Sequence, residues 1–77
     1  MTIEEQILQL DAAIAANPQD ALLYYERGKL HWKLGHRGLA LTDYNTSAHL
    51  DPSGPGPQAA AQSLAILNFY NPDQFNP

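Results

Sequence analysis

Two dipeptides that end helices, Asn17-Pro18 and Asp51-Pro52, lie 34 residues apart in this 77-residue chain. A residue that precedes proline is kept out of the helical region, so each dipeptide closes the helix before it. The residues ahead of the two dipeptides also correspond at this offset, and the pairs are Ile7 with Leu41, Leu10 with Tyr44, Ala13 with Ser47, and Ile14 with Ala48. A helical chain with this period is predicted to repeat one structural unit.

Local capping residues mark the first two helices. Over 1–17, Thr2 is followed three residues later by Glu5, which is the spacing of a capping box at a helix start. Asp20 is a good N-cap for a second helix. Gly35 is a good stop for it, because glycine takes the left-handed conformation that ends many helices. These residues predict two helices joined by a short connection.

The remaining chain is predicted to contain two more helices. A third helix ends at Asp51-Pro52, and a turn rich in proline and glycine follows it. The alanine- and leucine-rich segment 57–70 is predicted to be a fourth helix, with an irregular tail over 71–77. Nothing in the sequence has the alternation of a strand. We therefore expect an all-α fold of about four helices, in which short connections make consecutive helices antiparallel.

The segment from Asp20 to Pro52 resembles a tetratricopeptide repeat. The family pattern of an aromatic, leucine-glycine, tyrosine, alanine, a second aromatic and proline appears as Tyr24, Arg27-Gly28, His31, Ala40, Tyr44 and Pro52. Arg27 stands where leucine is usual, and His31 stands where tyrosine is usual. The resemblance implies antiparallel helix–turn–helix repeats, as in a short piece of an α-solenoid. It also implies a protein–protein interaction module, an adaptor or scaffold, rather than an enzyme.

The resemblance predicts a single helical domain over 1–77 with one complete repeat. The complete repeat is 20–52, while 1–17 resembles the second half of a preceding repeat. The helix over 57–70 resembles the capping helix that ends such an array. One helix pair cannot bury its own apolar faces, so the flanking helices must cover the central repeat. Any surface that they leave uncovered is a candidate for self-association.

Catalytic and metal-binding motifs are absent from the sequence. There is no cysteine, which excludes disulfides and thiolate metal ligands. The three histidines, at positions 31, 36 and 49, do not have the spacing of metal ligands on one helical face. No nucleophile elbow or phosphate-binding loop is present. We therefore predict that the chain is not an enzyme and has no cofactor and no metal site.

The charges form a local basic patch on an acidic chain. The formal net charge is −4, which argues against nucleic acid as a partner. The N-terminal region carries Glu4 and Glu5 where a secretory signal carries cations, and the longest apolar run, 64–67, is too short to span a bilayer. We expect a soluble, cytoplasmic protein with no membrane partner. The four cations lie within eleven residues, at Arg27, Lys29, Lys33 and Arg37.

One face of the second helix is the candidate binding site. Steps of three or four residues connect four of its members, and a neighbouring lysine completes the set of Leu22, Tyr25, Lys29, Trp32 and Lys33. The resemblance places this face in the concave groove that takes peptides in tetratricopeptide proteins. A tryptophan between two lysines suits an acidic peptide or a terminal carboxylate. The alternative is that Trp32 packs against the fourth helix while the lysines only solvate the surface.

The fourth helix offers a second candidate surface. Its apolar residues surround more than one face, so it is either buried on two sides or offered to a partner. The alternative function is accordingly a structural module that mainly self-associates through its terminal helices, for example as a homodimer. The residues predicted for this contact are Leu64, Leu67, Phe69 and Tyr70.

Overall fold

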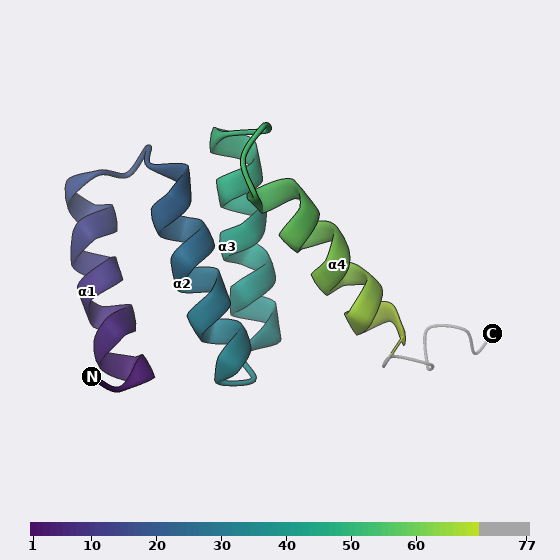
Figure 1. The fold of residues 1–77 in the computed structure, drawn as a ribbon, viewed down its shortest axis with the longest axis horizontal. Helices are drawn as coiled ribbons and strands as arrows, with labels where there is room; N and C mark the ends of the chain where they lie inside the picture. Colours follow the sequence, from purple (N-terminus) through teal and green to yellow (C-terminus); the bar gives the residue numbers. More distant parts are fainter. Residues whose placement is uncertain (70–77) are drawn as a thin grey trace.

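The computed structural model describes residues 1–69, and within that range the chain forms four helices and no strand. The helices are α1 (Ile3–Ala16), α2 (Ala21–Lys33), α3 (Arg37–Leu50) and α4 (Gly56–Phe69). Figure 1 shows α1, α2 and α3 side by side in alternating directions, with α4 leaning away from α3. The predicted all-α, antiparallel fold is confirmed. Tyr70 and the predicted tail over 71–77 lie outside the described residues.

The predicted capping box is present at the start of α1. The Thr2 hydroxyl accepts a hydrogen bond from the Glu5 backbone N–H at 3.1 Å, and the Glu5 carboxylate accepts one from the Thr2 backbone N–H at 2.8 Å. The backbone hydrogen bond from Thr2, and then the one from its hydroxyl, lower the pKa of Glu5 because they favour its charged form. The start of α1 is therefore determined by residues that are close together in the sequence.

Capping residues also set the ends of α2. The Asp20 side chain accepts a hydrogen bond from the Leu22 backbone N–H at 3.1 Å, as an N-cap should. Gly35 has a φ of 81°, a left-handed conformation that favours glycine, and the chain reverses there into α3. The short turn makes α2 and α3 an antiparallel hairpin.

The fourth helix begins at Gly56, one residue earlier than the sequence predicts. Pro57 therefore lies in its first turn. This is compatible with a helix because the first N–H groups have no intrahelical partner, so a proline there removes no hydrogen bond. The exact start of α4 could not be predicted from composition, because glycine and proline are typical both of turns and of the first residues of a helix.

The centre of the molecule is a close contact between α2 and α3. Ala40 and Tyr44 of α3 are buried, and Gly28 of α2 lies against both. A Cβ atom at Gly28 would lie 2.7 Å from Tyr44 Cε1 and 3.2 Å from the Ala40 carbonyl oxygen. Only glycine permits this approach. Gly28, Ala40 and Tyr44 are three positions of the tetratricopeptide pattern, and all three are in contact here.

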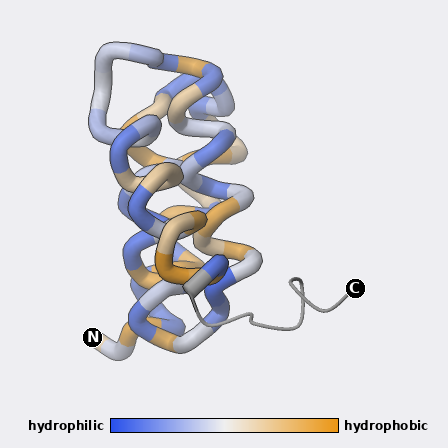
Figure 2. Tube along the Cα trace, turned by 90° about the vertical axis from the view of Figure 1, so that its right-hand side faces the viewer, coloured by the Kyte–Doolittle hydropathy of each residue, from blue (hydrophilic) through white to orange (hydrophobic). Residues whose placement is uncertain are grey.

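The buried core is thin and does not extend into α1. None of the residues of α1 is buried, whereas α3 buries four. Figure 2 shows hydrophilic and hydrophobic residues alternating along the helices, as expected where each helix packs with one side only. In the part of the chain that the structure describes, no helix has the length and apolar character needed to cross a bilayer.

Candidate functional site

The predicted basic patch is smaller than the sequence suggests, because the half-buried Arg27 is paired with two carboxylates. Its Nε and Nη2 atoms donate to the two carboxylate oxygens of Asp43 at 2.9 and 2.8 Å. Its Nη1 atom donates to Asp11 at 2.9 Å. One guanidinium thus joins α1, α2 and α3. The hydrogen bond to Asp43 is the main cause that raises the pKa of Arg27, so the side chain stays charged.

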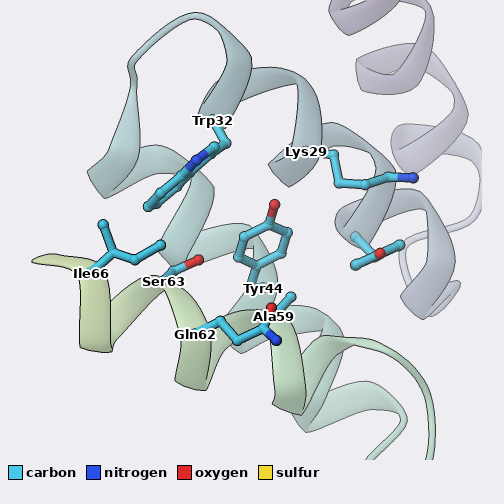
Figure 3. A pocket seen from close by; sticks show the side chains of 8 residues that line it. Lys29, Trp32, Tyr44, Ala59, Gln62, Ser63 and Ile66 are labelled. Carbon is cyan, nitrogen blue, oxygen red and sulfur yellow. The ribbon is translucent and has the colours of Figure 1, made fainter.

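A concave pocket of about 220 Å³ lies between α2 and α4. Its α2 wall consists of Tyr25, Lys29 and Trp32. Figure 3 shows Trp32 on one side of the pocket and Ile66 of α4 across from it. The rest of the α4 wall is formed by Ala59, Gln62 and Ser63. Three of the five predicted binding residues therefore line one pocket.

Tyr44 lies between the two walls. It belongs to α3, it lines the pocket, and its ring is tilted against that of Tyr25 with 5.9 Å between the ring centroids. Burial, more than the neighbouring Tyr25 and Asp43, raises the pKa of Tyr44. As an ordinary tyrosine hydroxyl is already protonated at neutral pH, this hydroxyl can donate a hydrogen bond there.

Cations lie over both aromatic rings of the α2 wall. The Lys29 ammonium is 4.8 Å from the centre of the Tyr25 ring and 3.2 Å from the Glu26 carboxylate. The Arg37 guanidinium is 5.1 Å from the centre of the Trp32 ring. Lys29 thus brings positive charge to the pocket itself, and each aromatic face attracts the cation that lies over it.

The other two predicted binding residues do not line this pocket. Leu22 is 55% exposed at the start of α2, and Lys33 is exposed at its end. For the predicted self-association residues, Leu64 is 50% exposed and Leu67 is half-buried. The Phe69 side chain and Tyr70 lie outside the described part of the structure. The exposed apolar surface of α4 also includes Ile66.

Several residues in or next to the pocket were not predicted as site residues from the sequence. Tyr44 could have been found, because it is an aromatic position of the resemblance and lies opposite Gly28. Arg37 follows Trp32 by five residues across a turn, so helical spacing does not connect the two side chains. The α4 wall carries no charge or motif that would indicate a site. Among residues 1–69, no group of three histidine, aspartate or glutamate side chains is placed to hold a metal ion.

The fold and these residues together define a class, an all-α helical repeat similar to tetratricopeptide proteins. Over 72 residues, which are 94% of this chain, the sequence is 35% identical to the cell division cycle protein 27 homolog of Caenorhabditis elegans. The chain spans 8% of the length of that protein. No family model matches the chain. No solved structure matches it either.

Proposed function

We propose that this chain is a protein-interaction module that binds an acidic peptide in the pocket between α2 and α4. The observation that supports this most directly is the grouping of Trp32, Tyr25 and Lys29 on one wall of a concave site. Aromatic rings supply contact area at little entropic cost, and the cations match acidic side chains. The tetratricopeptide resemblance and the similarity to a segment of the worm protein support a role in binding proteins.

The interactions around Lys29 define how the peptide is held. Lys29 pairs with Glu26, but that pair is exposed on both sides, so an acidic peptide can compete for the ammonium with little loss. The protonated Tyr44 hydroxyl adds a donor at the same pocket. A carboxylate in the pocket would thus meet Lys29 and the Tyr44 hydroxyl, with Trp32 and Ile66 as apolar contacts on the two walls.

Trp32 is the only tryptophan of the chain, so its fluorescence reports directly on the pocket. Titration with a peptide rich in aspartate and glutamate is expected to change this emission in a saturable way. Added salt should weaken the binding, because exposed charges are screened. Lys29→Ala should reduce the affinity about tenfold, in keeping with the loss of one charge-assisted contact.

The matched controls separate this pocket from general charge attraction. A peptide of equal length in which lysine replaces the acidic residues should leave the fluorescence unchanged. Lys33→Ala removes an equal charge outside the pocket and should cost less affinity than Lys29→Ala. If the acidic peptide has no effect, or if the two lysine variants bind it equally well, the pocket does not have this function.

A second candidate function is self-association through α4, which Leu64 and Ile66 favour because both are large, apolar and exposed. Light scattering over a dilution series should show a mass that falls towards one chain as the protein is diluted. Leu64→Glu should remain a single chain throughout, since a charge would be buried in the contact. A wild-type chain that stays monomeric at high concentration would rule out this function.

A further inference from the structure

A second open groove lies between α1 and α2, with a volume of about 420 Å³. Gln6, Gln9, Leu10 and Ala13 of α1 line one side, and Glu26 and Leu30 of α2 line the other. None of these six residues is buried. The groove therefore has an apolar floor and a polar rim, and it is open along its length to another helix.

The α1 side of this groove corresponds to the buried face of α3. Adding 34 to the numbers of its four residues gives the four residues that α3 buries, which are Ala40, Asp43, Tyr44 and Ser47. In α3 these residues are covered from two sides, because Gly28 of α2 lies against Tyr44 and Gly56 of α4 lies against Ser47. Among residues 1–69, no helix lies beside α1 in the place that α2 takes beside α3.

The groove is the repeat equivalent of the pocket between α2 and α4, with one wall absent. For α2 and α4 the matching offset is 33 residues, at which Glu26 and Leu30 of the groove correspond to Ala59 and Ser63 of the pocket. At the 34-residue offset that relates α1 to α3, Leu10 corresponds to Tyr44, which lies between the pocket walls. In the described part of the chain, the groove has no counterpart of the wall that α2 provides in the pocket. An added helix would have to lie there in the way that α2 lies against α3.

Charge indicates which helix fits this place. α4 carries no charged side chain from Gly56 to Phe69. The four α1 residues of the groove are also uncharged, and the Glu26 carboxylate is already paired with Lys29 at 3.2 Å. Docking α4 of another copy would therefore bury no unpaired charge, whereas a charged helix would pay a desolvation penalty.

The side of α4 that no residue of 1–69 covers, called here its free side, also matches in shape. Ala61 and Leu64 are exposed there, and the same shift of 33 residues takes Gly28 to Ala61. Within the chain, Tyr44 leaves no room for a Cβ atom at Gly28. In the groove the position of Tyr44 is taken by Leu10, whose smaller side chain leaves room for the methyl group of Ala61. The methyl group gained in replacing glycine by alanine is thus offset by the volume lost in replacing tyrosine by leucine.

We propose that copies of this chain associate head to tail, with α4 of one copy seated in the α1–α2 groove of the next. This arrangement specifies the self-association proposed above and rests on it. The α4 helix of one copy and α1 of the next form a helix pair equivalent to α2 and α3. Because the two surfaces differ and each chain has one of each, the contact is heterologous and repeats.

Two substitutions test this arrangement, each blocking one surface of the full chain. Ala61→Arg blocks the free side of α4, and Gln9→Arg blocks the groove. By sedimentation velocity, the wild-type mass should grow beyond two chains with concentration, while each variant alone should remain one chain. Their equimolar mixture should form a dimer that grows no further, because one groove and one α4 remain intact. Ala15→Arg, on the exposed face of α1 outside the groove, should associate like the wild type.

The outcomes distinguish this arrangement from the self-association on which it rests. If Gln9→Arg alone associates as the wild type does while Ala61→Arg does not, the contact is a symmetric one through α4 and the head-to-tail arrangement is wrong. The arrangement is also wrong if the wild type associates but the mixture of variants does not. If the wild type remains one chain up to about 1 mM, both are wrong. Circular dichroism checks that the variants keep their helices. Ala61→Glu and Gln9→Glu supply the same two blocks if an arginine variant unfolds.

Discussion

Arg27→Ala is expected to lower the free energy of unfolding by about 3–5 kcal/mol, because it leaves a buried carboxylate without its cation. The Asp43 side chain is only 6% exposed, and both of its oxygens accept hydrogen bonds from Arg27. For a small domain with a thin core, this is a large part of the total stability. Urea denaturation followed by circular dichroism measures the loss.

The controls for this prediction separate burial from charge. Lys29→Ala breaks an ion pair in which both side chains are largely exposed, and it should cost at most about 1 kcal/mol. The double variant Arg27→Leu with Asp43→Leu should recover most of the lost stability, since an apolar pair removes the unpaired charge. If Arg27→Ala costs no more than Lys29→Ala, the three-helix contact does not stabilise the fold.

Gly56→Leu is expected to cost about 3 kcal/mol, because it introduces a side chain where α4 touches the backbone of α3. A Cβ atom at Gly56 would lie 2.6 Å from the Ala48 backbone nitrogen and 2.8 Å from Ser47 Oγ. The backbone of a helix cannot yield as a flexible side chain can, so α4 must move away. Thermal denaturation measures the loss of stability, and the emission of Trp32 should change as the α4 wall of the pocket is displaced.

Gly38→Leu is the matched control for this substitution. Gly38 lies in α3, and a Cβ atom there would meet nothing within 4 Å. The variant should be as stable as the wild type or more stable by up to about 1 kcal/mol, since leucine is a better helix former than glycine. Equal effects of the two substitutions would show that α4 is not held by its contact at Gly56.

The helices could be predicted from sequence because their boundaries are set by neighbours in the chain. Thr2 with Glu5 and Asp20 satisfy backbone groups within one turn, and Gly35 supplies a conformation that its neighbours need. The common face of Tyr25, Lys29 and Trp32 follows in the same way from helical spacing. Each of these predictions needs no knowledge of how the helices pack.

The electrostatics could not be predicted, because they depend on contacts between helices. Arg27 lies 16 residues from both Asp11 and Asp43, on opposite sides along the chain. In an antiparallel helix pair, residues equally far from the connecting turn lie side by side at the same level along the helix axes. Asp11, Arg27 and Asp43 meet for this reason. The sequence shows four clustered cations, but it does not show that one of them is neutralised. The opposing α4 wall is likewise a result of packing.

The absence of buried residues in α1 has a consequence for local unfolding. The buried residues of the described chain belong to the other three helices and to the contacts among them, so α1 is the helix whose separation exposes the least core. Amide hydrogens of α1 should then exchange with solvent through openings that leave α2–α4 intact. The groove between α1 and α2 exists only while α1 is docked. Its availability is therefore governed by the stability of one helix rather than by that of the whole fold.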